Sequence, residues 1–247
     1  MNSAYSSLAD WFEYLNADCD YEQWSQSLYE RLCAEGVTAG AGLDIGCGSG
    51  AFTRAFARRG FAMTGYDVSE EMLAKASRLS AEEGVFPQYV CADARKIRVI
   101  GGRKADFALC VNDCLNYIPP RDVPAFFRRV AACLRRGGAF LFDVSSAKKL
   151  RETIGNNAFC EDRDEVAWMW FNRLCEDRVE MDVTLFVREA DGRFRRGDEH
   201  HVQYIHEEAA LLAAAEGAGF AIRSVGGSYA AGAEPADARV NVCCVRR

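Results

Sequence analysis

The sequence predicts an α/β protein with a doubly wound, mostly parallel seven-stranded sheet and a small antiparallel β insert. Short apolar runs alternate with longer amphipathic segments over 40–145, strand-like runs follow each other without helices over 158–205, and the alternation then resumes. Strand–helix alternation is typical of parallel sheets with right-handed crossovers. We therefore expect a core formed by 1–157 and 206–247, with 158–205 as the insert.

The expected elements of the core follow from local patterns. Short apolar runs bounded by turn residues predict the strands 42–45, 61–67, 86–93, 105–111 and 138–144. Helical spacing of apolar residues predicts helices over 1–35, 50–59, 69–83, 121–135 and 206–218. The last two runs, 220–225 and 238–245, can form a hairpin, which completes the sheet.

The insert is predicted as three antiparallel strands, 166–172, 178–189 and 194–205. In the second run, Val179 and Met181 alternate with Glu180 and Asp182, as in a half-buried strand. Asp191–Gly192 is a hairpin signal. Because the insert follows the fifth strand, it should emerge at the edge where the parallel strands end and cap a cleft there.

Composition narrows the class of protein. The 247 residues carry a formal net charge of −6, which disfavours nucleic acid as a partner. No run of 18 apolar residues predicts a membrane span, and the N-terminus has no basic region typical of a secretory signal, so a cytoplasmic protein is expected. The eleven cysteines include no CxxC pair, which favours reduced thiols over disulfides or a metal site.

The strongest local motif is LDIGCGSG at 43–50. A strand ends near Asp44, a turn with Gly46, Gly48 and Gly50 follows, and a helix begins near Ala51. Glycines let a ligand approach the main chain, and a helix N-terminus presents free N–H donors. Doubly wound sheets bind nucleotides at this place, so the motif predicts a nucleotide site, with a plain tight turn as the alternative.

Two acidic residues at strand ends strengthen this prediction. Asp67 ends the second strand about 20 residues after the turn, where a carboxylate can accept both ribose hydroxyls. Asp93 ends the third strand, where its carboxylate can accept the adenine amino group while the N–H of Ala94 donates to the ring. Ala51 stands at the third glycine position of the dinucleotide fingerprint, which only modestly disfavours NAD, so a nicotinamide-dependent reductase stays open.

The ordered motifs resemble those of class I S-adenosylmethionine-dependent methyltransferases. They are LDIGCGSG, GYDVSEEMLAKA, CADAR, FALCVNDCLNYI and LRRGGAFLFDV, and they cover roughly 40–145. More narrowly, the chain resembles a group of uncharacterised bacterial methyltransferases with a small antiparallel sheet after strand five. The resemblance implies an enzyme that uses S-adenosyl-L-methionine to methylate a small molecule.

The resemblance also implies the residues that hold this cofactor. They are Tyr21, Asp44, Gly46, Cys47, Gly48, Gly50, Asp67, Val68, Met72, Asp93, Ala94, Asn112 and Asp113. The glycines would wrap the methionine and ribose, Asp44 would reach the methionine ammonium, and Met72 would pack on the adenine. Asn112 and Asp113 would lie near the sulfonium. Tyr21 would cover the methionine end, with ordinary helix packing as an equal alternative.

The sequence defines the residues that would contact the methyl acceptor less well. A sulfonium is already a strong electrophile, so proximity and alignment are the main requirements, and no catalytic residue is assigned. Candidate acceptor contacts are Asn116, Tyr117, Trp170 and His200, with core packing as the alternative for Trp170 and a surface position for His200. Asp113 could act as a base, although a hydrogen-bonding role is favoured.

Other functions remain open at this stage. An RNA or protein methyltransferase and a non-catalytic S-adenosylmethionine-binding module both fit the motifs. The chain lacks the Asn/Asp-Pro-Pro-aromatic tetrapeptide of nucleic-acid amino-methyltransferases after strand four, which disfavours nucleic-acid bases. We expect a monomer or homodimer with a small-molecule acceptor and no metal.

Overall fold

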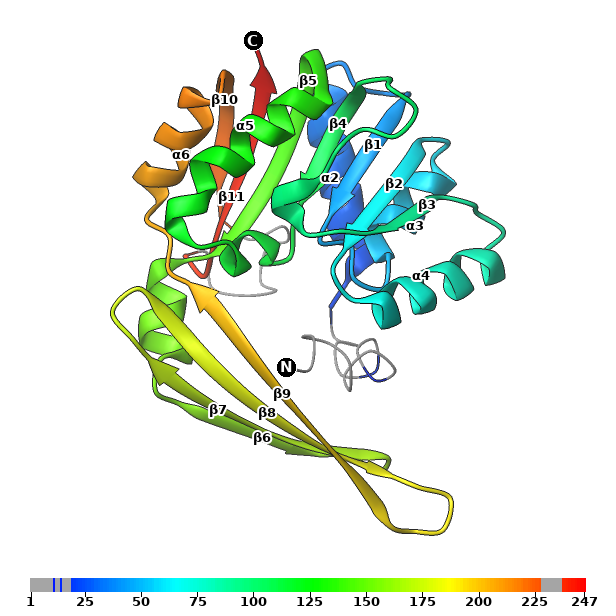
Figure 1. Cartoon of the computed structure of the whole chain (residues 1–247), viewed down its shortest axis with the longest axis vertical. Coiled ribbons are helices and arrows are strands. Elements are labelled where there is room, and N and C mark those ends of the chain that lie inside the picture. Colours follow the sequence, from blue (N-terminus) through cyan, green and yellow to red (C-terminus); the bar gives the residue numbers. More distant parts are fainter. Residues whose placement is uncertain (1–10, 12–13, 15–18, 228–236) are drawn as a thin grey trace.

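A computed structural model describes residues 11, 14, 19–227 and 237–247. It contains two separate sheets, one of seven strands within a layer of helices on each side and one of four strands (Figure 1). Most of the helical region predicted before residue 20 lies outside the described residues. None of the helices within the described ranges combines the length and apolar character that crossing a bilayer requires.

The seven-stranded sheet confirms the predicted fold class. Its order is β10-β11-β5-β4-β1-β2-β3, and β11 runs antiparallel to both of its neighbours. The strands are β1 Ala41–Ile45, β2 Ala62–Asp67, β3 Gln88–Cys91, β4 Ala105–Cys110, β5 Leu134–Ser145, β10 Phe220–Gly226 and β11 Arg239–Arg246. The order reverses direction between β1 and β4, and ligands of such sheets bind in the crevice at this reversal.

Helices cover both faces of this sheet. They are α2 Tyr21–Ala34, α3 Ala51–Arg58, α4 Glu70–Glu82, α5 Val123–Cys133 and α6 Glu208–Gly217, with short helical turns at Ala94–Lys96, Cys114–Tyr117, Pro120–Asp122 and Lys149–Ile154. Phe127 of α5 packs with Phe140 in one core cluster, whereas Phe56 of α3 packs with Leu141 in another. Neighbouring β5 residues thus serve opposite faces, because side chains alternate along a strand.

The four-stranded sheet forms the insert. Its strands are β6 Ala158–Asp162, β7 Val166–Leu174, β8 Arg178–Arg188 and β9 Phe194–Tyr204, in that order. The expectation of three strands was wrong because β6 has no buried residue, so no apolar alternation marks it in the sequence. The predicted turn at Asp191–Gly192 joins β8 to β9, with Gly192 at φ 83°.

The register of the insert decides which side chains face the core. Trp170, Val183 and Glu199 lie opposite one another on adjacent strands and share one face, called here the inner face. Asp182 and His200 are likewise paired, on the opposite, outer face. The inner face packs against the helical turn Lys149–Ile154, which attaches the insert to the core.

Candidate functional site

A cavity opens at the carboxyl ends of β1, β2 and β4. It encloses about 270 Å³, near the lower end of the roughly 300–1,000 Å³ that small-molecule sites commonly measure. Ten of the thirteen predicted cofactor residues line it: Tyr21, Gly46, Cys47, Gly48, Asp67, Val68, Met72, Asp93, Ala94 and Asn112. Of the predicted acceptor residues, Tyr117 lines it.

The glycine-rich turn forms one wall of this cavity. The N–H groups of Gly46 and Cys47 donate to the carbonyl oxygen of Tyr66 at 2.7 and 3.0 Å, which binds the turn to the end of β2. Gly46 has φ 74°, and a Cβ there would lie 2.2 Å from Sγ of Cys114. Only glycine therefore fits at this position, where the chain from β1 meets the loop after β4.

Asp67 presents its carboxylate to the cavity. Its Oδ2 accepts the N–H of Gly48 at 2.9 Å and its Oδ1 accepts the N–H of Ser69 at 3.0 Å. Burial raises the pKa of Asp67, and these backbone N–H groups oppose the shift by stabilising the charged form. Both oxygens are thus held in place with lone pairs left over, as binding a vicinal diol requires.

Asp93 lies on the cavity wall as half of an ion pair. Arg95 donates to it from Nε at 3.0 Å and from Nη2 at 2.6 Å, and this contact lowers the pKa of Asp93. Nη1 of Arg95 also reaches Asp122 at 2.9 Å. Arg95 itself lines the cavity. Sequence reasoning missed it, although an arginine two residues after a strand-end acid was a usable signal.

Asp44 lies beneath the glycine turn and does not line the cavity, so its contact with the methionine ammonium stays a prediction. It is 1% exposed and accepts the hydroxyl of Thr53 at 2.5 Å. Burial raises the pKa of Asp44 to about 6, the Thr53 bond opposes this, and the charge of Asp67 adds to it. Gly50 is also absent from the wall, since it caps α3 at φ 80°. Asp44 thus anchors the turn to Thr53 of α3, and Gly50 joins the turn to that helix.

The loop after β4 forms the facing wall. Asn112 and Asp113 both have left-handed backbone conformations, with φ of 57° and 65°, which cost roughly 1–2 kcal/mol per residue outside glycine. Their N–H groups donate to the carboxylate of Asp143 at 2.7 and 2.9 Å. These two bonds to a buried acid compensate the loop's strain and orient Asn112 toward the cavity.

Two residues of this loop bond to the scaffold and are not among those that line the cavity, so their roles toward cofactor and acceptor stay predictions. The carboxylate of Asp113 accepts from Arg239 at 2.6 Å and from the Ser145 hydroxyl at 3.0 Å, so it is neither at the cavity wall nor placed as a base. Asn116 is fully buried: its amide donates to the Tyr204 carbonyl at 3.0 Å and its oxygen accepts the Ser145 N–H at 2.9 Å. Asn116 thereby ties the insert to the core.

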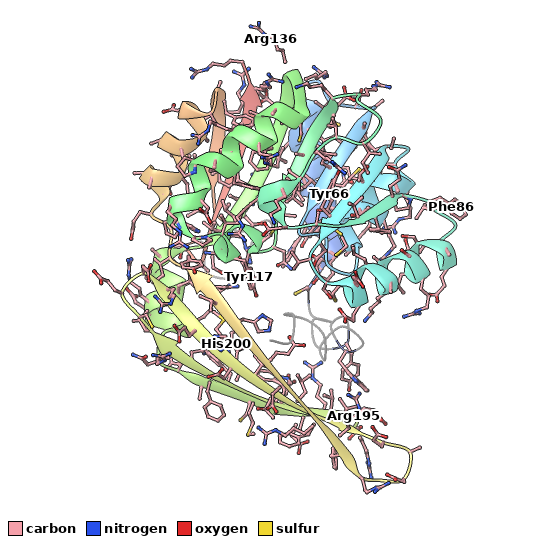
Figure 2. All side chains as sticks on the ribbon, in the orientation of Figure 1. Tyr66, Phe86, Tyr117, Arg136, Arg195 and His200 are labelled. Atoms are coloured by element: carbon pink, nitrogen blue, oxygen red, sulfur yellow. The ribbon has the colours of Figure 1, made fainter. Side chains whose placement is uncertain are left out.

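Trp170 and His200 also lie away from the cavity. Trp170 packs on Phe159, with ring centroids 5.4 Å apart, and on the cluster around Leu150, as its packing alternative anticipated. His200 is on the outer face of the insert, where Nδ1 lies 2.7 Å from Asp182. Figure 2 shows His200 on the insert and Tyr117 at the edge of the core that faces it. The histidine that reaches Tyr117 is His201, which the sequence reasoning missed.

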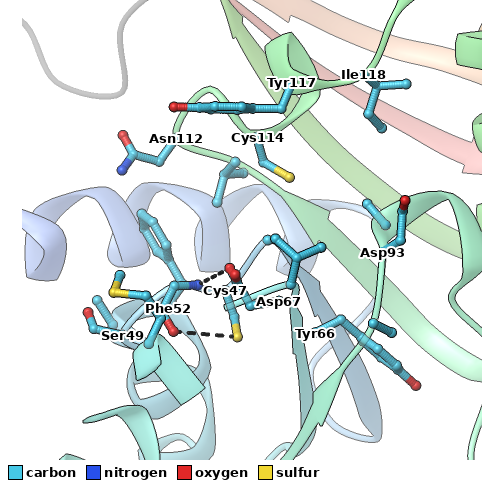
Figure 3. Close-up of a pocket in the computed structure, with 18 of the residues that line it drawn as sticks. Cys47, Ser49, Phe52, Tyr66, Asp67, Asp93, Asn112, Cys114, Tyr117 and Ile118 are labelled. Atoms are coloured by element: carbon cyan, nitrogen blue, oxygen red, sulfur yellow. Dashed lines mark hydrogen bonds between the residues drawn. The ribbon is translucent and has the colours of Figure 1, made fainter. Parts of the chain in front are cut away.

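The two walls of the cavity come from the ends of different strands. Figure 3 shows Tyr117 and Asn112 on one side of the cavity, across from Phe52 and Asp67. Tyr117 and Asn112 follow β4, whereas Asp67 ends β2, so the cavity spans the reversal in strand order. Within the described ranges, no three His, Cys, Asp or Glu side chains gather as they would around a metal ion.

Comparisons with known proteins agree with this architecture. Residues 43–138 match a family described as a methyltransferase domain. A protein of Geobacillus sp. (strain WCH70), described as a candidate methyltransferase, is 30% identical over 82% of this chain and 83% of its own. An S-adenosylmethionine-dependent methyltransferase from Clostridium acetobutylicum superposes with TM-score 0.87 at 28% identity over 98% of both chains. An amino pentose methyltransferase from Micromonospora echinaspora, with bound cofactor, shares the fold at TM-score 0.76 and 20% identity over 96% of both.

Proposed function

Because the chain belongs to the class I S-adenosylmethionine-dependent methyltransferases, we propose that it methylates a small molecule bound between the cavity and the insert. The enzyme class and the cofactor follow from the family. The acceptor and the residues that contact each ligand are our proposal. The observation that carries it is the pair of fixed Asp67 oxygens in a cavity whose other wall presents Tyr117 and Asn112.

The cavity walls fit the parts of the cofactor. Asp67 would hold the ribose hydroxyls, and Asp93 with Ala94 would hold the adenine. The exposed backbone at Gly46 and Gly48 would receive the methionine portion, with Tyr21 of α2 closing that end. Bound there, the cofactor supplies an electrophilic methyl group whose transfer needs an aligned nucleophile and exclusion of water.

A small acceptor suits the wall of the cavity formed by the loop after β4. Tyr117 offers a hydroxyl and Asn112 a polar side chain on the wall nearest the insert, and both can orient a polar nucleophile. The structural relatives include an amino pentose methyltransferase and a sugar N-methyltransferase, which favours a polar metabolite of comparable size. The net charge of −6 does not favour a polyanionic acceptor.

Calorimetry and isotope transfer test this proposal. Titration with S-adenosylmethionine, S-adenosylhomocysteine and NAD should give binding of the first two and none of the third. Incubation with cofactor carrying a labelled methyl group and a metabolite extract should then label a small molecule, and the label should persist after nuclease and protease treatment of the extract. Binding without any transfer would indicate a non-catalytic module, and label lost on such treatment would indicate a macromolecular acceptor.

A further inference from the structure

Three polar side chains form a hydrogen-bonded series that ends at the cavity. Nε2 of His201 lies 3.0 Å from Oε2 of Glu199, and Nδ1 of the same ring lies 3.4 Å from the Tyr117 hydroxyl. The Tyr117 and His201 rings meet edge-on, 6.1 Å apart at 75°. Glu199 and His201 belong to the inner face of the insert, whereas Tyr117 comes from the core and lines the cavity.

Burial defines the roles of these atoms. The side chain of Glu199 is 0% exposed and that of His201 is 5% exposed. A buried carboxylate needs a donor, and an ionised carboxylate is acceptor-only, so Nε2 of His201 carries the proton that Glu199 accepts. In the neutral imidazole, Nδ1 is then an acceptor, and the Tyr117 hydroxyl donates to it. The partners of the ring thus select one tautomer.

The Glu199–His201 pair lies in an otherwise apolar part of the inner face. On the same face of β8, the side chains opposite and beside it are apolar: Met181, Val183 and Leu185. Replacing both partners of a buried hydrogen bond by apolar groups of the same shape can be nearly neutral, so packing alone does not require Glu199 and His201. What the pair adds is a basic nitrogen directed at a phenol of the cavity wall.

We propose that Tyr117 receives the proton of the acceptor nucleophile, with His201 and Glu199 as the positioning residues that hold this proton. The proposal rests on the function proposed above and narrows the acceptor to one whose nucleophile carries a proton, a hydroxyl or an ammonium group. Geometry limits the direct contact to Tyr117, because it lines the cavity while His201 lies behind it.

A hydroxyl acceptor gains the methyl group and loses its proton. A lone pair of the acceptor oxygen bonds to the methyl carbon while the sulfur–carbon bond breaks and leaves its electron pair on sulfur. The hydroxyl proton passes to Oη of Tyr117 as the phenol proton passes to Nδ1 of His201. The imidazolium so formed remains bonded to Glu199. An ammonium acceptor loses its proton along the same route before its lone pair attacks.

The first experiment needs no acceptor. The chain has three histidines, so ¹⁵N and ¹H resonances of the imidazoles can be assigned with the His200→Gln and His201→Gln variants. His201 should carry its proton on Nε2 at pH 7, and both Tyr117→Phe and Glu199→Gln should shift the ¹⁵N resonances of its ring. A proton on Nδ1, or ring resonances that neither substitution changes, overturns the proposal, because Tyr117 and Glu199 would then not be bonded to this ring as described.

The second experiment measures transfer to the small molecule that the labelled-methyl screen identifies. Tyr117→Phe and His201→Gln should lower kcat by about 10²–10⁴-fold, the usual contribution of proton transfer, with cofactor affinity changed less than twofold. The loss in His201→Gln should shrink as pH rises, since a more ionised acceptor needs less help. His200→Gln is the matched control, one residue away on the outer face, and should leave kcat unchanged.

The outcomes separate the two proposals. Failure of the wild type to bind S-adenosylmethionine or to label a small molecule contradicts the proposed function. A wild type that transfers methyl groups while Tyr117→Phe and His201→Gln retain its kcat at every pH contradicts the relay alone. A labelled amine and a labelled hydroxyl compound distinguish the two acceptor chemistries, and an acceptor methylated on a carbon or sulfur without such a proton also contradicts the relay.

Discussion

The guanidinium of Arg239 lies 2.7 Å from the carboxylate of Asp143, with Arg239 only 4% exposed and Asp143 fully buried. This pair connects β11 to β5. The same guanidinium binds Asp113, and Asp143 also accepts the N–H groups of Asn112 and Asp113. The last strand of the chain therefore holds the loop that precedes Tyr117 in its left-handed conformation.

Replacing Arg239 by Ala should destabilise the fold by about 3–5 kcal/mol, because it leaves a buried carboxylate without its counter-charge. Urea unfolding at pH 7 measures this free energy. Arg136→Ala is the control: Arg136 is exposed, and its loss should stay within about 0.5 kcal/mol. A cost below 1 kcal/mol for Arg239→Ala would show that the pair is not needed.

Replacing Asp44 by Asn should remove a pH dependence of stability. Burial raises the pKa of Asp44 from 3.8 to about 6, so the folded state binds more protons than the unfolded state between these values. Stability contributed by Asp44 is therefore present below pH 4 and lost as pH rises to about 6. The free energy of unfolding of Asp44→Asn, relative to wild type, should rise over this window by up to about 3 kcal/mol.

Chemical denaturation of both proteins at pH 4, 5, 6 and 7 measures this difference. Above pH 6 it should be constant, because Asp44 is then ionised in both states. A difference that stays flat from pH 4 to 7, or that falls, contradicts a raised pKa at this position.

Replacing Asn116 by Ala should loosen the joint between core and insert without altering the cofactor site. The Ser145 N–H and the Tyr204 carbonyl lose their partner, and a buried polar group left unpaired costs about 1–3 kcal/mol. Hydrogen exchange at Ser145 should accelerate, while calorimetry should give an unchanged affinity for S-adenosylmethionine. A large loss of affinity would show that Asn116 contributes to the cofactor site.

Replacing Gly50 by Ala should cost more than replacing Gly60 by Ala. Both residues have positive φ, 80° and 87°, but a Cβ at Gly50 would lie 2.4 Å from the Tyr89 hydroxyl, while nothing lies within 4 Å at Gly60. The Gly60 variant thus measures the left-handed backbone alone, about 1–2 kcal/mol. Urea unfolding should give a further loss for Gly50→Ala, and equal losses would mean that Tyr89 moves aside freely.

Replacing Asp67 by Ala should weaken the binding of S-adenosylmethionine by about 10–150-fold, since hydrogen bonds to a charged group contribute about 1.5–3 kcal/mol. Calorimetry measures the change. Glu82→Ala on the exposed side of α4 is the control and should bind as wild type does. Unchanged affinity in a folded Asp67→Ala protein would place the ribose elsewhere.

The glycine turn and the strand-end acids of the cavity wall were predictable because their determinants are local. A strand, a glycine turn and a helix start follow one another over 43–51, and Asp67 and Asp93 stand at strand ends. Parallel strands bring their carboxyl ends to one edge of a sheet, so residues at those ends gather there whatever the details of packing. Arg95 was not predicted to line the cavity; it lies at the wall because it pairs with Asp93.

The acceptor half depends on register and packing. A shift of one residue along a strand moves a side chain to the other face, and this separates His200, paired with Asp182 outside, from His201, which meets Tyr117 inside. Asn116 follows the same strand as Tyr117, yet it is turned away to bond Tyr204. Neither outcome can be read from spacing, since both need the contact between two sheets that are distant in sequence.

The sequence by itself determined the parallel core, the terminal hairpin and the glycine turn with its strand-end acids, because hydrophobic period and turn chemistry act over a few residues. Only the tertiary structure decided that Asp44 and Asp113 support the walls from behind and that Glu199 and His201 stand beside Tyr117. Those relations join segments tens of residues apart, and burial, which local pattern does not specify, selects which of two neighbouring polar side chains turns inward.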